Sequence, residues 1–292
     1  MNGLLLLNKS LGHSSNRAMQ QIKRLFGIKK IGHTGSLDPL ASGMLPLCIG
    51  EATKFAQYLL DAEKTYVVSG LLGVQTTTGD VEGDVVAEAS VPALSFEELN
   101  QILNAFRGEI SQVPPMYSAL KHQGQPLYRY ALQGLEIERN ARTVQILSLE
   151  LLSFENSIFT IRVECSKGTY MRTLVEDVGK MIGCGAHVVK LHRLSTFGFQ
   201  AEEMISFEDL EALSETERLQ HIRPMDVMVK DFPRLFLPAD ESLRLVQGQT
   251  LRFDASGPQI YRVYNANQQF FGLAEFVPGK GLIAKRLCVL DV

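Results

Sequence analysis

The sequence predicts an α+β fold followed by a small β domain, and three observations support this prediction. Over residues 1–230, apolar runs of strand length alternate with segments whose apolar residues recur at helical spacing. From about residue 231, short alternating runs separated by glycines replace this pattern, as in small β-barrels. No short repeat is present, which argues against a solenoid. We therefore expect one domain over residues 1–230 and a β-barrel domain over residues 231–292.

The first part of the chain is expected to alternate strands and helices. Residues 3–7 read as a short buried strand, and Ser14 or Ser15 can cap a helix that ends at Gly27. A glycine-rich loop follows. The further elements expected up to residue 108 are a helix at about 51–60, a strand at 64–72 rich in Tyr and Val, a loop at 73–84, and a helix that opens with the capping box Ser95–Glu98.

Residues 114–142 interrupt this order with prolines, tyrosines and basic residues, which indicates an excursion from the core. Interleaved aromatic and basic side chains can bind RNA, although tyrosines in a short helix more often pack. The later expected elements are two strands within 142–165, a helix after the segment 166–172, a strand at 187–199, an acidic helical segment after 202, and short β runs at 235–237, 250–253, 259–265, 270–276 and 282–290.

Composition narrows the class of protein. No apolar run approaches the roughly 18 residues that a membrane span needs, and residues 3–7 are too short for a signal peptide. We therefore expect a cytoplasmic protein without a membrane partner. The four cysteines are widely scattered and lack paired metal-binding spacing, so we expect reduced thiols and no metal site.

Charge is unevenly distributed along the chain. The formal net charge is −3, yet residues 1–60 contain seven basic residues against two acidic ones. A basic half favours a polyanionic partner, although most charge clusters are simply solvated surfaces.

Asp38 lies in the loop over residues 32–43, which contains three glycines and a proline. Because Asp38 precedes Pro39, its backbone is pushed out of the helical region, and such a loop presents its side chain. Asp, Pro, Ser and Gly are also ordinary turn residues, so a plain surface turn is the alternative.

Other residues could complete a site around this carboxylate. Arg172 could pair with Asp38 as a bidentate fork, or could form a weak helical pair with Glu176. Tyr66 could stack on a ring or move a proton, although a strand tyrosine is usually a core residue. His33 could displace a base or be an ordinary loop residue.

A phosphate partner would need further positive charge. Lys54 could neutralise a phosphate, although most helix lysines are solvated.

Several common motifs are missing. The sequence contains neither a GxxxxGK[ST] phosphate loop nor a GxGxxG fingerprint after a strand, and it lacks the zinc-deaminase pattern. Carboxylate chemistry without a metal or redox cofactor, beside a basic surface, is the class that remains.

Six ordered segments within residues 3–200 resemble the bacterial tRNA pseudouridine-55 synthases of the TruB type. They are GLLLLNKSLGHSSN, GHTGSLDPLASGMLPLCIGEATKF, KTYVVSGLLG, PPMYSALKHQGQPLYRYALQG, CSKGTYMRTLVEDVG and CGAHVVKLHRL. The last domain resembles the small PUA-like domain of that family less distinctly. Ser10, Ser36 and Ser42 are small departures from the residues that are frequent in the family.

This resemblance implies a fold and a reaction. The fold would be the pseudouridine synthase fold, a mixed and mainly antiparallel sheet with flanking helices, an RNA-gripping insertion at about 114–142 and a PUA-like barrel. The reaction would isomerise uridine 55 in the T loop of tRNA to pseudouridine, without a cofactor. A non-catalytic tRNA-binding or folding protein and a synthase for another RNA are the alternatives.

The resemblance also assigns roles to residues. By motif, Asp38 matches the catalytic aspartate, Arg172 the arginine that pairs with it, and Tyr66 the tyrosine that stacks on the uracil. The residues that match substrate-binding positions are His33, Lys54, Tyr170 and Leu191. The implied partner is tRNA, gripped at the T stem-loop and the acceptor stem by a monomeric protein.

Overall fold

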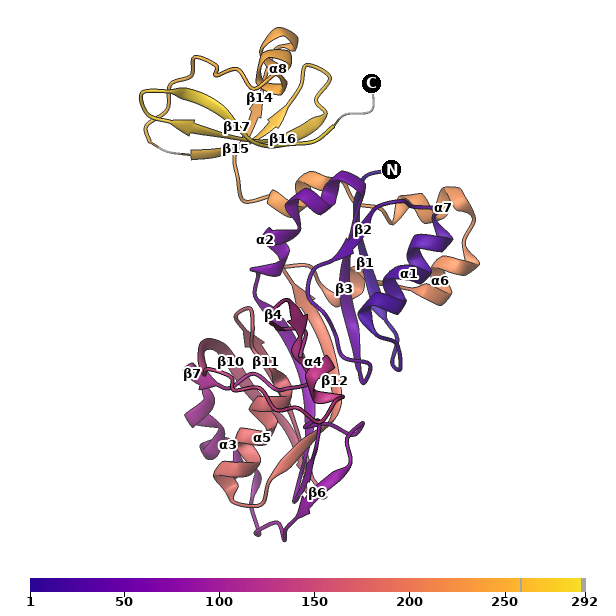
Figure 1. Cartoon of the computed structure of the whole chain (residues 1–292), viewed down its shortest axis with the longest axis vertical. Helices are drawn as coiled ribbons and strands as arrows, with labels where there is room; N and C mark the ends of the chain where they lie inside the picture. The colour runs from indigo at the N-terminus through magenta and orange to yellow at the C-terminus, as the bar shows by residue number, and fades with distance from the viewer. Residues whose placement is uncertain (258, 290–292) are drawn as a thin grey trace.

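The computed structural model describes residues 1–257 and 259–289, and it contains a large sheet with helices and a smaller C-terminal sheet. The smaller sheet lies at one end of an elongated molecule, beyond the N-terminus and α2 (Ala56–Leu60) (Figure 1). The predicted α+β class is confirmed. None of the helices in the described ranges combines the length and the apolar character needed to span a membrane.

The large sheet has nine strands within the described residues, and they pair in an order far from the order of the sequence. Only the pairs β1–β13 and β3–β12 are parallel, so the sheet is mixed and mainly antiparallel, as predicted. Along the sheet the strands are β13 (Ile205–Ser206), β1 (Gly3–Lys9), β3 (Ala41–Ile49), β12 (Ala186–Thr196), β4 (Lys64–Leu72), β11 (Ile158–Cys165), β10 (Arg142–Glu155) and β7 (Gly108–Gln112), with β2 (Ile31–His33) beside β3.

Strand β3 was not predicted from the sequence. Its sequence contains Gly43 and Pro46, two residues that weaken a strand prediction. In the fold the Pro46 carbonyl accepts from the Thr34 amide at 3.1 Å. The strand is buried along almost its whole length, so tertiary packing stabilises it where local preference does not.

The helices α1 (Ser15–Leu25), α3 (Phe96–Leu103) and α5 (Met171–Ile182) pack on the large sheet. Their apolar stripes and the inward side chains of the strands form one buried cluster that includes Ile22, Leu99, Leu174, Val68 and Ile161. Ser95 and Glu98 form the predicted capping box at α3. This core supports the strands and the helix that carry the candidate site.

The other face of β1 and β3 packs against a second cluster. It joins Leu4 and Met44 to the short helices η1 (Gly50–Phe55) and η4 (Met225–Val229), and to Leu273 of the C-terminal sheet. The predicted helix at 51–60 is therefore the 3₁₀-helix η1 followed by α2.

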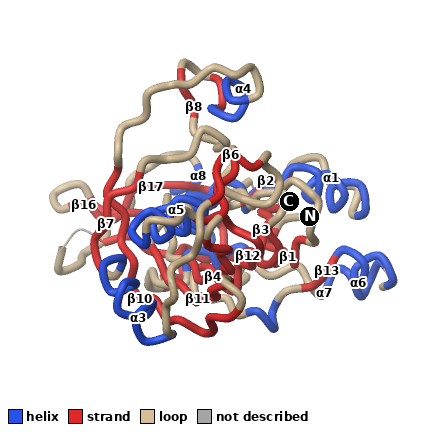
Figure 2. The backbone as a smooth tube through the Cα atoms, turned by 90° about the horizontal axis from the view of Figure 1, so that it is seen from below, coloured by secondary structure: helices blue, strands red, loops and turns tan. Residues whose placement is uncertain are grey.

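The insertion over residues 114–142 stands out from the body of the protein (Figure 2). It contains the hairpin β8 (Lys121–His122) and β9 (Gln125–Pro126), and the helix α4 (Leu127–Ala131). The remaining short elements of the large domain are β5 (Val74–Thr76), β6 (Val85–Glu88), η2 (Asn104–Phe106), η3 (Ala201–Glu203), α6 (Phe207–Ala212) and α7 (Glu215–Gln220).

The C-terminal domain contains a four-stranded sheet, and the described residues do not close it into the expected barrel. Its strands, in order, are β14 (Arg234–Phe236), β15 (Gln259–Tyr264), β16 (Phe270–Val277) and β17 (Gly281–Leu287), with one parallel pair, β14–β15. Helix α8 (Ala239–Val246) packs Leu245 into the core of this sheet, so the apolar face is covered without closure.

Two expected β runs differ from the structure. The run at 250–253 is only a single bridge between Leu251 and Leu282, and the run at 282–290 ends at Leu290, which lies outside the described residues.

Candidate active site

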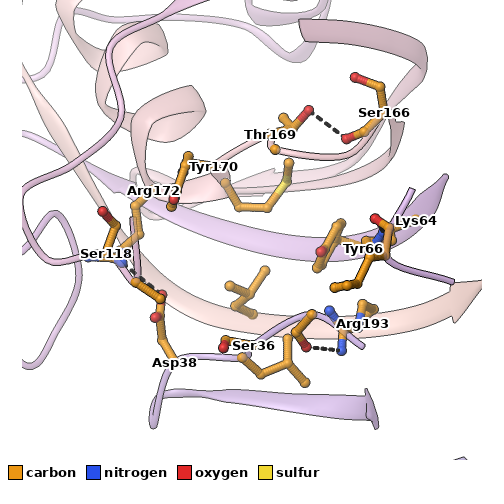
Figure 3. A pocket seen from close by; sticks show the side chains of 17 residues that line it. Ser36, Asp38, Lys64, Tyr66, Ser118, Ser166, Thr169, Tyr170, Arg172 and Arg193 are labelled. Atoms are coloured by element: carbon orange, nitrogen blue, oxygen red, sulfur yellow. Dashed lines mark hydrogen bonds and ion pairs between the residues drawn. The ribbon is translucent and has the colours of Figure 1, made fainter. Parts of the chain in front are cut away.

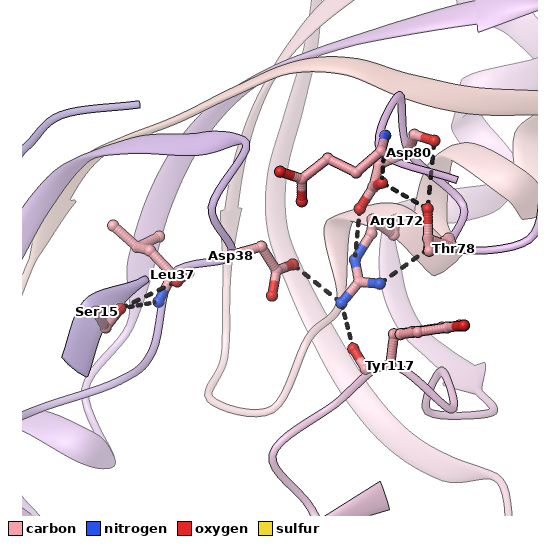
Figure 4. A network of polar contacts seen from close by, with 8 residues as sticks. Ser15, Leu37, Asp38, Thr78, Asp80, Tyr117 and Arg172 are labelled. Carbon is pink, nitrogen blue, oxygen red and sulfur yellow. Dashed lines mark hydrogen bonds and ion pairs between the residues drawn. The ribbon is translucent and has the colours of Figure 1, made fainter. Parts of the chain in front are cut away.

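The loop between β2 and β3 holds Asp38 in a fixed position. The Ser15 hydroxyl, at the start of α1, accepts from the Leu37 amide at 2.7 Å and donates to the Leu37 carbonyl at 3.0 Å (Figure 4). Gly43 at the end of the loop has a φ of +101° and no room for a Cβ against the backbone of Arg193. The loop is thus tied to the core instead of being a free surface turn.

Arg172, the second residue of α5, forms the predicted ion pair with Asp38, at 3.0 Å from Nη2 to Oδ2. The predicted bidentate fork is wrong, because the other nitrogens of Arg172 are engaged elsewhere (Figure 4). Nη1 donates to the Thr78 carbonyl at 2.9 Å, Nη2 also donates to the Tyr117 carbonyl at 2.6 Å, and Nε lies 3.7 Å from Asp80. The alternative helical ion pair with Glu176 does not occur among the described residues.

The arginine is therefore shared between two carboxylates and two carbonyls. Its side chain is 4% exposed, and that of Asp80 is 3% exposed. Asp80 also accepts from the Thr78 hydroxyl at 2.6 Å and from the Glu82 amide at 3.0 Å. Such a satisfied network holds a guanidinium in one orientation.

Burial dominates the electrostatics of Asp38. The carboxylate is partly buried, with 38% of its side chain accessible. Desolvation raises its pKa above the ordinary value, and the nearby Arg172 guanidinium opposes this rise. The result is a partly buried carboxylate that is open to solvent on one side and has Arg172 as its charged partner.

A cavity of about 270 Å³ opens beside Asp38 and Arg172. Tyr66 from β4, Leu191 from β12 and Tyr170 before α5 line it, so the cavity brings together five of the seven predicted site residues (Figure 3). Tyr66 is 8% exposed, and burial raises its pKa. An aromatic and an aliphatic side chain in one cavity suit a flat ring.

His33 lines a second cavity of about 620 Å³, which Asp38 also lines. Desolvation, and secondarily the Arg193 guanidinium, lowers the pKa of its imidazole. Tyr117 and Tyr128 from the insertion also line this space. The two cavities share Asp38, so a bound polymer could occupy both.

Lys54 lines neither cavity. Its ammonium lies 2.6 Å from Glu51 and donates to the Leu287 carbonyl of β17 at 2.9 Å. It thus connects η1 to the C-terminal sheet.

Four charged residues near the site were not predicted from the sequence. Asp80 lies in the segment expected as a loop, and Arg193 lies in the expected strand at 187–199. Arg193 is 1% exposed and donates to the carbonyls of Met44 and Gly35, at the two sides of the Asp38 loop.

The other two missed residues are lysines. Lys9 and Lys64 are buried, and desolvation lowers the pKa of each to about 8. A signal was present for Lys64, because it begins the strand that carries Tyr66. No cluster of three or more metal-ligating side chains occurs within residues 1–257 and 259–289.

Three family models match successive parts of the chain. They are the TruB family pseudouridylate synthase (N terminal domain) over residues 23–171, the tRNA pseudouridylate synthase B C-terminal domain over 172–230, and Pseudouridine synthase II TruB, C-terminal, over 233–288.

Curated relatives match over nearly the full length. A protein of Marinomonas sp. (strain MWYL1) named tRNA pseudouridine synthase B is 50% identical over 281 residues, which cover 94% of this chain and 91% of the relative. A protein of the same name from Coxiella burnetii (strain RSA 493 / Nine Mile phase I) is 46% identical and covers 98% and 94%.

Solved structures share the fold. A chain in the crystal structure of a Cbf5-Nop10-Gar1 complex matches with a TM-score of 0.72 and 25% identity, covering 98% of this chain and 84% of that chain. A chain of an H/ACA RNP bound to a substrate RNA containing 2'-deoxyuridine has a TM-score of 0.72 at 23% identity, covering 99% and 85%, and shows likeness of fold alone. The family models and the relatives confirm the predicted resemblance: the chain belongs to the TruB family of pseudouridylate synthases.

Proposed function

We propose that the protein isomerises uridine 55 in the T loop of tRNA to pseudouridine. The family and the relatives named tRNA pseudouridine synthase B support this reaction. The observation that carries it is the partly buried Asp38 carboxylate, which pairs with Arg172 at 3.0 Å and lines a cavity whose walls include Tyr66 and Leu191.

In the reaction the bond between N1 and C1′ breaks, the uracil rotates, and C5 bonds to C1′. The proton on C5 leaves and N1 gains one, so that no atom is gained or lost. Asp38 is the proposed catalytic group. Its carboxylate attacks C1′, attacks uracil C6 or supports a glycal intermediate. Each route requires the ionised form of Asp38, which Arg172 stabilises at 3.0 Å.

Tyr66 and Leu191 are proposed to hold the uracil between them, with Tyr170 at the wall of the cavity and the Tyr66 hydroxyl available for proton transfer. Enclosure of the ring offsets part of the few kcal/mol that flipping a base out of its stack costs. His33 is proposed to enter the T loop from the second cavity.

The insertion and the C-terminal domain are proposed to bind the tRNA. The insertion over 114–142 would hold the T stem-loop, and residues 231–292 would form an RNA-binding domain that reaches the acceptor stem, beside a catalytic domain over 1–230. We propose that the protein acts as a monomer in the cytoplasm. The role of Lys54 as a phosphate ligand stays a prediction.

Substitution Asp38→Asn tests the proposal. The amide keeps the shape of the side chain but is no nucleophile, so pseudouridine formation should be abolished while the Kd for tRNA stays within about 3-fold of wild type. Chemical mapping of pseudouridine in a tRNA transcript and filter binding measure the two properties.

The same experiment separates the alternatives. Appreciable turnover by Asp38→Asn would contradict the assignment. A wild-type protein that binds the transcript but forms no pseudouridine would favour the RNA-folding alternative, and modification at another position would indicate a different target.

A further inference from the structure

The hydroxyl of Ser118 is buried at the candidate site without a partner. Ser118 is 5% exposed, and its Oγ has no hydrogen-bond partner within the described part of the protein. It lines both cavities that meet at Asp38. Ser118 belongs to the insertion over 114–142 and not to the sheet that carries the rest of the site.

A buried hydroxyl normally has a partner, because burial without one loses the hydrogen bonds that water supplies. The described residues contain seven buried side-chain atoms without a partner. Only two of them, Ser118 Oγ and His33 Nδ1, belong to residues that line these cavities. The position of Ser118 therefore points to a group that enters from the cavity.

The backbone holds Ser118 firmly next to the ion pair. Its amide donates to the Met116 carbonyl at 2.9 Å, and its carbonyl accepts from the Tyr128 amide at 3.1 Å. The preceding carbonyl, that of Tyr117, accepts from Arg172 Nη2 at 2.6 Å, and the same nitrogen contacts Asp38 (Figure 4). A hydroxyl fixed in this way can contact a substrate without ordering its own segment first.

The surroundings indicate which part of a nucleotide would meet this hydroxyl. Figure 3 shows Ser118, Arg172 and Asp38 on one side of the cavity and Lys64, Tyr66 and Arg193 on the other. The carboxylate must reach the junction of sugar and base, since C1′ and C6 are both bonded to N1. The carbon next to C1′ carries the 2′-hydroxyl, a neutral group that a neutral serine can hydrogen-bond.

We propose that Ser118 contacts the substrate directly and hydrogen-bonds the ribose 2′-hydroxyl of the target uridine. The inference rests on the proposed function. It makes Ser118 a residue that distinguishes ribose from deoxyribose, because the 2′-hydroxyl is the group that differs between RNA and DNA. It also means that the insertion supplies part of the reaction cavity in addition to gripping RNA.

The test compares Ser118→Ala with Thr196→Val. Thr196 is also buried, at 1% exposure, with a hydroxyl that has no partner in the described residues, but it lines neither cavity. The two substrates are a T-arm stem-loop RNA with uridine at the target and the same RNA with one 2′-deoxyuridine there. The measurements are kcat/KM on the first RNA and Kd for the second.

Ser118→Ala should lower kcat/KM on the uridine RNA by roughly 5- to 30-fold, as expected for one lost hydrogen bond. Its Kd for the deoxyuridine RNA should equal that of wild type, since that RNA lacks the contacted group. Thr196→Val should change neither quantity.

Three results would overturn the inference: an unchanged kcat/KM, a comparable weakening of Kd for the deoxyuridine RNA, or an equal loss in Thr196→Val. A wild-type enzyme that forms no pseudouridine would refute the proposed function itself, which is a different outcome.

Discussion

The contacts of the Arg172 guanidinium depend on residues from several distant segments of the chain. The pairing of Arg172 with Asp38 is predicted by the sequence, and the 3.0 Å contact agrees. The sequence does not predict that the same guanidinium also binds two carbonyls and approaches Asp80. Those groups come from segments far apart in the chain, and no local pattern in the sequence links them.

Substitution Arg172→Lys should reduce the single-turnover rate by about 100-fold or more, because one ammonium cannot copy a planar group that contacts four partners. Pseudouridine formation under single-turnover conditions measures the rate, and a thermal melt checks folding. Arg162→Lys, on β11, is the matched control and should be near wild type. A near wild-type rate for Arg172→Lys would show that charge alone suffices.

Helix α5 connects the candidate site to the hydrophobic core. Its first turn presents Arg172. One turn later Glu176 lies against the loop that carries Thr78 and Asp80, where a Cβ on Gly79 would come within 2.7 Å of Glu176 Oε1. The helix was predicted from its apolar stripe. The packing of its polar side against the loop was not predicted. That loop is held beside β12 by hydrogen bonds between segments far apart in the chain, from the Val188 amide to the Gly79 carbonyl and from the Val81 amide to the Val188 carbonyl.

Glu176 should make stability depend on pH. Burial raises its pKa from 4.5 to about 7, which corresponds to roughly 3 kcal/mol at 1.4 kcal/mol per pKa unit. Because the folded pKa is raised, this contribution is present below pH 4.5 and is lost as pH rises through 7.

The side chain of the variant Glu176→Gln cannot ionise. As pH rises from 5 to 8.5, the unfolding free energy of wild type should therefore fall relative to that of the variant. Chemical denaturation at these two values measures the difference. Glu211→Gln, on the surface of α6, is the control. A difference that does not change with pH would contradict the assignment.

The whole molecule is held together by a core that crosses from the large sheet to the C-terminal sheet. Phe55 packs on Phe270 at 5.5 Å between ring centroids, and Leu273 is buried among residues of β1 and β3. The polar contacts of Glu51 and Lys54 with β17 and Val289 lie beside this core. We infer that Lys54 orients the C-terminal sheet.

Substitution Lys54→Met separates this role from phosphate binding. As an orienting residue, Lys54 should contribute about 1 kcal/mol of stability, and its loss should leave the salt dependence of tRNA binding unchanged. If Lys54 is instead a phosphate ligand, the substitution should reduce the slope of log K for tRNA binding against log salt concentration by about 1.

Denaturation and filter binding at several salt concentrations measure the two effects. Lys285→Met, which removes an ion pair within the C-terminal sheet, is the matched control. If Lys54→Met reduces the salt dependence of tRNA binding and leaves stability unchanged, Lys54 binds a phosphate and does not orient the C-terminal sheet.

The sequence alone determined the family, the α+β class and the helices with clear apolar stripes, and it predicted Asp38 as the central residue of the site. Apolar periodicity and short motifs are local, so they can be read along the chain. Only the tertiary structure decided that β3 is a central strand, that the last sheet is open in the described residues, and that Asp80, Arg193 and Ser118 join the site. These features depend on contacts between distant segments, and burial, which sets the pKa of Asp38, exists only once those segments have packed.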